Sequence, residues 1–198
     1  ENRLGYDRHI NFVDIALRTI ASESSFIERG WIKYETAFDL VTEAVAGRID
    51  RPGDLLGAMC DEDLLRVQEG HGESYLSFAF ERVGDFFAAG EILRKVGVCS
   101  EKLLADDARA KLKNVVESGL RSGVLEALAI LLPERHGVEL FEFCNDDLCS
   151  EMTRCFIESI PWRRTARLSE GTVSFIEQFI LKDGELSILF VSRLLDVS

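Results

Sequence analysis

Apolar residues recur at helical spacing over most of the chain, and this period predicts a mainly helical protein. The first helix is expected over residues 9–21, with its apolar residues on one face. A second is expected over residues 35–46, where Gly47 can close it. A third follows over residues 52–62, since proline is tolerated in a first helical turn.

Two apolar runs, Leu64–Gln68 and Tyr75–Phe80, flank a short turn that contains glycine and predict a β-hairpin. Residues 26–27 and 30–32 are expected to form a short extended piece before the second helix. Three helices followed by a hairpin is the order of a winged-helix module. Residues 1–96 are therefore predicted to be such a module.

The second half of the chain is predicted to be helical throughout. Its apolar stripes fall near residues 104–115, 124–132, 148–160, 173–180 and 186–195. Pro133 is expected to end the second stripe and Pro161 the third. Successive helices joined by short turns favour an α-solenoid-like helical array over residues 97–198. The last helix is nearly all apolar, so a further helix of a longer chain is expected to cover it.

The charge balance argues against nucleic acid as a partner of this chain. Its 198 residues include 23 Lys and Arg and 35 Asp and Glu, a net charge of −12 that repels phosphate. Five scattered cysteines predict reduced thiols, and no apolar run is long enough to cross a bilayer. Glu1–Leu4 begins without Met or a signal peptide, which predicts a cytoplasmic part of a longer protein.

No pattern in the sequence predicts catalysis by this chain. The G-x-x-x-x-G-K-[ST] loop that surrounds a nucleotide phosphate is missing. Cys144, Cys149 and Cys155 lack the close spacing of a zinc site, and His136 is a weak fourth ligand. The three histidines have no nucleophile in a recognisable elbow. We therefore expect no enzyme activity, no metal and no cofactor in this chain.

A basic patch follows the third stripe of the second half. It is formed by Trp162, Arg163, Arg164 and Arg167. These residues could dock an acidic partner, with the tryptophan as anchor. Alternatively, Trp162 fills a gap between two helices while the arginines stay solvated.

The run after the predicted hairpin resembles the winged-helix signature of NACHT-like STAND ATPases. That signature reads Phe-x-His/Tyr, three residues, Gln, Asp or Glu, then Ala-Ala, and the matching positions here are Phe78, Phe80, Glu81, Asp85, Ala88 and Ala89. In many relatives the histidine touches the β-phosphate, and here Phe80 cannot. Arg82 is the nearest side chain that could reach a phosphate. Asp85 is expected to cap a helix over residues 86–96.

Two further segments are similar to antiviral STAND NTPases of bacteria. They are residues 123–141 and residues 160–163. Together with the winged-helix signature, the resemblance covers about residues 54–172. It implies a parent protein with an upstream P-loop ATPase module, which uses ATP and Mg²⁺ and forms homo-oligomers on activation. The helical region would sense a phage protein. The winged helix would hold the ATPase module closed until then.

Two other function classes remain open. A DNA-binding winged-helix regulator with a helical dimerisation domain would need Lys and Arg on the third helix, yet residues 52–62 contain none. An enzyme would need a pocket with convergent ionisable groups. The leading hypothesis is that the chain is the regulatory part of a STAND ATPase. It predicts an exposed apolar patch near the hairpin or the first helix.

Overall fold

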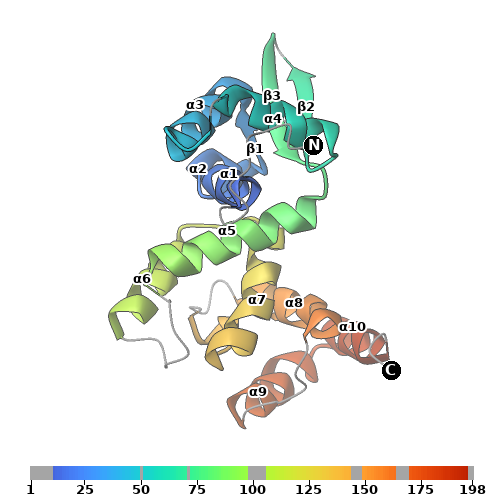
Figure 1. The fold of residues 1–198 in the computed structure, drawn as a ribbon. Coiled ribbons are helices and arrows are strands. Elements are labelled where there is room, and N and C mark those ends of the chain that lie inside the picture. The colour runs from blue at the N-terminus through green and yellow to red at the C-terminus, as the bar shows by residue number, and fades with distance from the viewer. Residues whose placement is uncertain are drawn as a thin grey trace. The chain divides into compact units, whose positions relative to one another are not determined.

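The computed structural model describes residues 11–49, 51–70, 72–97, 106–143, 149–163 and 170–195. The protein is mainly helical, with one small antiparallel sheet (Figure 1). It divides into two compact units, Glu1–Glu91 and Ile92–Ser198. The division falls within helix α5, Glu81–Lys95.

Unit 1 alternates helices with short strands. Its elements before α5 are α1 Phe12–Ala21, α2 Ser24–Arg29, β1 Trp31–Lys33, α3 Tyr34–Val45, α4 Pro52–Asp61, β2 Leu65–Gly70 and β3 Glu73–Phe78. Helix α1 begins where Asn11 caps it, since the Asn11 Oδ1 accepts a hydrogen bond from the Asp14 N–H at 3.0 Å. Pro52 starts α4, as its fixed φ suits a first turn.

The sheet has the strand order β1–β3–β2, with every pair antiparallel. Strands β2 and β3 form the predicted hairpin, with Leu65 opposite Phe78 and Gly70 opposite Glu73. Strand β1 pairs with β3 through Ile32 and Leu76. The sheet therefore joins a segment before α3 to the hairpin that follows α4.

Alternating side chains of the sheet enter the apolar core of unit 1. Ile32, Leu65 and Leu76 are almost fully buried with residues of α1, α3 and α4. Phe78 packs on Phe26, with ring centroids 5.1 Å apart. A Cβ atom at Gly84 would lie 2.9 Å from both of these rings, so close packing of α5 requires glycine here.

Unit 2 consists of helical segments of several types. After the end of α5 they are α6 Asp106–Glu117, α7 Ser122–His136, η1 Leu140–Phe143, α8 Cys149–Ser159, η3 Ile160–Trp162, α9 Glu170–Phe175, η4 Ile176–Ile180 and α10 Gly184–Leu195. Helix α7 is buried on nearly all sides and packs against α8. The solenoid-like stacking expected from the sequence stays a prediction.

An aromatic cluster forms a second apolar core in unit 2. Phe141 and Phe175 stack with parallel rings at a centroid distance of 4.0 Å, and Phe156 meets both edge-on. Ile180 of η4 and Phe190 of α10 are buried in the same cluster. Segments α8, α9, η4 and α10 therefore share one core.

Several predicted boundaries were wrong. Residues 26–27 lie in helix α2 and only Trp31–Lys33 is extended, because Phe26 turns inward to meet Phe78. Pro133 lies inside α7, which continues to His136. A proline in the last turn removes one hydrogen bond, and Gly137, with φ +65°, ends the helix instead. The sequence also predicts Ser169 as the N-cap of the helix near residues 173–180, and this residue lies outside the described residues.

Helix α5 begins five residues earlier than predicted. The Phe80 carbonyl accepts hydrogen bonds from the N–H groups of Val83 and Gly84, so the first turn starts directly after β3. Asp85 is therefore inside the helix and is 5% exposed. Its predicted role as a helix cap was wrong.

Candidate interaction surfaces

The residues that resemble the winged-helix signature divide between core and surface. Phe78 is buried and contacts Phe87 at 5.9 Å between ring centroids, and Ala88 and Ala89 are fully buried in α5. Their small side chains let the helix approach its neighbours closely. The structure thus gives these three positions a packing role.

Phe80, Glu81 and Arg82 are exposed where β3 meets α5. The Phe80 ring is 66% exposed, although a phenylalanine side chain is usually covered in a folded protein. Arg82 lies in the first turn of α5. It lines neither of the two pockets described below.

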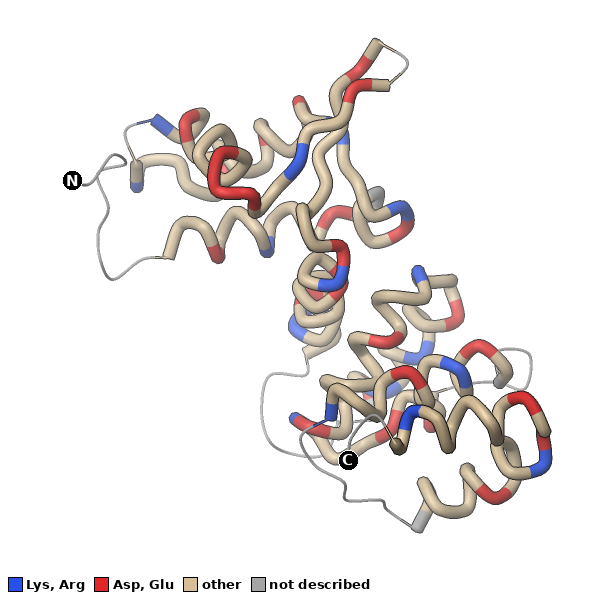
Figure 2. The backbone as a smooth tube through the Cα atoms, turned by 90° about the vertical axis from the view of Figure 1, so that its right-hand side faces the viewer, with Lys and Arg blue, Asp and Glu red and all other residues tan. Residues whose placement is uncertain are grey.

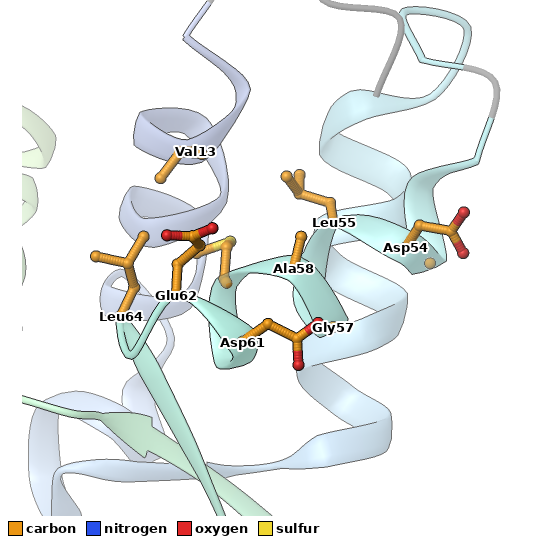
Figure 3. A pocket seen from close by; sticks show the side chains of 10 residues that line it. Val13, Asp54, Leu55, Gly57, Ala58, Asp61, Glu62 and Leu64 are labelled. Atoms are coloured by element: carbon orange, nitrogen blue, oxygen red, sulfur yellow. The ribbon is translucent and has the colours of Figure 1, made fainter. Parts of the chain in front are cut away.

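An open pocket of about 680 Å³ lies along α4 and faces α1 (Figure 3). Its apolar lining comes from Val13, Leu55, Ala58, Met59 and Leu64. Figure 3 shows the Glu62 carboxylate between Val13 and α4, with Asp54 and Asp61 at other points of the rim. We call this pocket the acidic groove.

Two glycines of α4 line the acidic groove. Gly53 and Gly57 lie four residues apart and both line the pocket. A Cβ atom at Gly57 would meet nothing within 4 Å, so that position borders open space. The sequence analysis did not find this site, although two glycines one turn apart in a helix were a visible signal.

Exposed apolar side chains lie at the base of the hairpin. Leu64 is 38% exposed, Val67 44% and Val83 46%, in addition to Phe80. The Leu64 carbonyl accepts a hydrogen bond from the Ala79 N–H at 3.0 Å, which places Leu64 next to the start of α5. An apolar patch of this kind is what the leading hypothesis predicts.

The predicted basic patch is divided by the structure. Trp162 is 57% exposed, whereas the Arg163 side chain is 9% exposed and its Nη1 lies 2.9 Å from the Glu139 Oε1. Arg163 therefore does not belong to an exposed patch. Arg164 and Arg167 lie outside the described residues.

A polar network surrounds the Arg163 side chain. Its Nε donates to the Ser159 Oγ at 2.9 Å, and the Thr172 hydroxyl donates to the Glu139 Oε1 at 3.4 Å. The guanidinium also lies 4.8 Å from the centroid of the Phe156 ring. The network ties α8 to α9 and to the segment before η1 beside the aromatic cluster.

Cys60 and Cys155 are poorly suited to nucleophilic chemistry. Burial raises the pKa of the Cys155 thiol to about 12, and burial together with Asp61 raises the pKa of Cys60. Such thiols are weak nucleophiles at neutral pH. Within the described residues, no cluster of three or more His, Cys, Asp or Glu could hold a metal ion.

Two further surface features are a smaller pocket in unit 1 and exposed apolar side chains on α10. A smaller pocket of about 240 Å³ lies between the start of α3 and the hairpin, lined in part by Lys33 and Glu73. On α10, Ile188 is 74% exposed and Leu195 69%. Of the helices within the described ranges, none is long and apolar enough to cross a membrane.

Unit 1 thus carries an acidic groove and, at the base of the hairpin, exposed apolar side chains. Comparisons of the chain with protein families, with curated proteins and with solved structures found no match.

Proposed function

We propose that unit 1 is a winged-helix module that binds another protein domain rather than DNA. The chain would be the regulatory and interaction part of a STAND-type antiphage defence ATPase. Its helical region would sense a ligand such as a phage protein. Unit 1 would transmit that event to a nucleotide-binding module elsewhere in a cytoplasmic parent protein.

The order of elements in unit 1 supports this proposal. Helices α1 and α2 and the short strand β1 precede the consecutive helices α3 and α4, and a hairpin follows them. The strand before α3 returns to pair with the second hairpin strand, which gives the order β1–β3–β2. This arrangement joins a strand that precedes α3 to the hairpin that follows α4, which is the pairing expected of a winged helix.

The single observation that carries the proposal is the chemistry of α4. In a DNA-binding winged helix, the second helix of this pair lies in the major groove and supplies basic side chains. Helix α4 contains no Lys or Arg, carries Asp54 and Asp61, and borders a groove with an apolar floor. Such a surface favours an apolar and basic protein segment over a phosphate backbone.

The exposed apolar patch supplies the second support. Leu64 belongs both to the acidic groove and to the patch at the hairpin base that includes Phe80. In the proposed mechanism, these residues pack on the ATPase module in an off state. A ligand that binds the helical region only when this contact is broken would shift the balance to an active, oligomeric parent.

The test begins with the coding sequence upstream of this chain, where the proposal requires a P-loop ATPase module. If no P-loop ATPase module is encoded there, the STAND assignment is wrong, and only the proposal that unit 1 binds another protein domain remains. If the module is present, it should co-purify with this chain when the two are expressed separately. Gly57→Phe, which fills the acidic groove, and Phe80→Asp should each abolish co-purification.

Gly57→Ala is the matched control, because it adds one methyl group in open space and should leave binding intact. Circular dichroism should confirm that every variant folds. Binding of duplex DNA to the chain at physiological salt would instead support the DNA-binding regulator.

A further inference from the structure

The outward face of the sheet in unit 1 has a composition unlike the rest of the chain. Successive strand residues point to opposite faces, and Ile32, Leu76 and Phe78 face the core. The residues between them therefore face outward. We call this surface the outer sheet face, formed by Trp31, Lys33, Arg66, Gln68, Tyr75 and Ser77.

Strand register arranges these residues in two rows. Arg66, Ser77 and Trp31 are neighbours across the three strands in the first row. Gln68, Tyr75 and Lys33 form the second. A small serine between two large side chains leaves a shallow gap in the first row, with an arginine on one side and an indole on the other.

Positive charge predominates on this face, although the chain has a net charge of −12. Lys33 and Arg66 are exposed on it, and the Arg29 guanidinium lies 5.2 Å from the centroid of the Trp31 ring. Among the outward strand positions, the one carboxylate is Glu73. Figure 2 shows acidic positions near the tip of the hairpin, and the basic residue of its strands, Arg66, lies on β2 further from the tip.

The Glu73 carboxylate already accepts hydrogen bonds from other side chains of the protein. Its Oε1 accepts from the Lys33 Nζ at 2.6 Å, and its Oε2 accepts from the Tyr75 hydroxyl at 2.9 Å. The hydrogen bond from Lys33 lowers the pKa of Glu73 and raises that of the lysine. Both groups therefore stay charged near neutral pH, and the cations of Arg29 and Arg66 remain for a ligand.

We propose that the outer sheet face binds an acidic peptide segment of a partner protein. Arg66 would hold one carboxylate through the paired N–H groups of its guanidinium, and the Ser77 hydroxyl would donate to the same segment. Arg29 would hold a second carboxylate, with the edge of Trp31 beside the apolar part of the peptide. This surface is separate from the acidic groove and does not depend on the function proposed above.

A peptide suits the face better than single-stranded nucleic acid does. Nucleic-acid platforms need free aromatic faces on which bases stack. Here Arg29 covers the Trp31 ring and Tyr75 meets it edge-on at 4.6 Å between centroids.

The test is an array of fluorescein-labelled acidic peptides with varied apolar residues, titrated with the full chain at low salt. Single-stranded DNA oligonucleotides serve as the competing probe. Arg66→Glu and Arg29→Glu should each lower the affinity for the peptides that bind by about tenfold or more, because negative charges of the protein and the peptide then face each other. Arg48→Glu on the turn after α3 changes the net charge equally and should leave binding unchanged.

Trp31 supplies an independent readout. In a Trp162→Phe background it is the one remaining tryptophan, so bound peptide should change its fluorescence. The proposal is overturned if no acidic peptide binds, if Arg48→Glu weakens binding as much as Arg66→Glu, or if Trp31 fluorescence stays constant. Preferential binding of the DNA probe would also overturn it, in favour of a nucleic-acid surface.

Discussion

Each unit contains an arginine paired with a carboxylate, and the two pairs differ in exposure. In unit 1, Arg18 lies 3.2 Å from the buried Glu91, but the arginine side chain is 48% exposed. In unit 2, Arg163 and Glu139 are 9% and 7% exposed. Water therefore solvates one partner in unit 1 and hardly reaches either partner in unit 2.

The comparison shows two ways of placing charge in a small domain. In unit 1 the arginine of the pair stays half-exposed, and other charged groups lie at the surface in the acidic groove and on the outer sheet face. Unit 2 buries a complete ion pair beside its aromatic cluster, so both charges depend on each other. We expect this buried pair of unit 2 to act mainly on the stability of that unit.

The largest expected effect is that of breaking the buried pair. Arg163→Ala leaves the Glu139 carboxylate buried without its counter-charge and should lower the free energy of unfolding by about 3–5 kcal/mol. Arg18→Ala should cost about 1–2 kcal/mol, because that arginine is half-exposed and its contribution is that of a charged hydrogen bond. Urea unfolding followed by circular dichroism measures both.

Tryptophan fluorescence can show which unit loses stability, because Trp31 belongs to unit 1 and Trp162 to unit 2. Arg163→Ala should move the transition seen by Trp162 more than that seen by Trp31. The double variant Arg163→Met with Glu139→Leu should recover most of the loss, because no charge is then left buried. Equal losses for Arg163→Ala and Arg18→Ala would contradict the comparison.

The next largest effect is expected in the core of unit 1. Gly84→Ala places a methyl group 2.9 Å from the Phe26 and Phe78 rings and should destabilise the unit by about 1–3 kcal/mol. Urea unfolding detected by Trp31, with Trp162 replaced by Phe, measures the change. Wild-type stability of Gly84→Ala would show that the rings move apart easily.

A third prediction concerns alkaline pH and unit 2. The folded state raises the pKa of Cys155 from 9.0 to about 12, so above pH 9 the unfolded chain loses a proton that the folded chain keeps. Stability is therefore lost as pH rises from 9 toward 12. One unit above pH 9, the loss relative to Cys155→Ala should be about 1 kcal/mol. If the free energy of unfolding of the wild type and of Cys155→Ala changed equally with pH, the raised pKa of Cys155 would be disproved.

The smallest effect is expected at the open position of the acidic groove. Gly57→Ala should stabilise α4 by about 0.5–1 kcal/mol, because alanine restricts the unfolded chain and meets no neighbour. Thermal unfolding of Gly57→Ala beside Gly84→Ala provides the measurement. A loss of stability at residue 57 would mean that the groove is filled in solution.

Periodicity predicted the helices of unit 1 well where one face is buried. Helices α1, α3 and α4 fall within a few residues of their predicted ranges, and the hairpin pairs as expected. The pattern was misleading where a contact outweighs local preference. Phe26 is helical because it meets Phe78, and Asp85 lies inside α5 because the helix begins directly after β3.

The candidate surfaces were harder to predict than the elements. The outer sheet face requires the pairing of β1 with β3, which brings Trp31 beside Ser77 from positions far apart in the chain. The acidic groove depends on α1 and α4 both contributing to one surface. Arg163 looked like a surface residue because its neighbours in sequence are basic, and only packing shows that it is buried.

The sequence alone determined the helical character of the protein, the position of the hairpin and the acidity of α4. These properties are local, since spacing, glycine and proline positions and side-chain charge act over a few residues. Tertiary structure decided which charges are buried and which surfaces exist. Burial and cross-strand neighbours depend on contacts between distant segments, which local preferences do not specify.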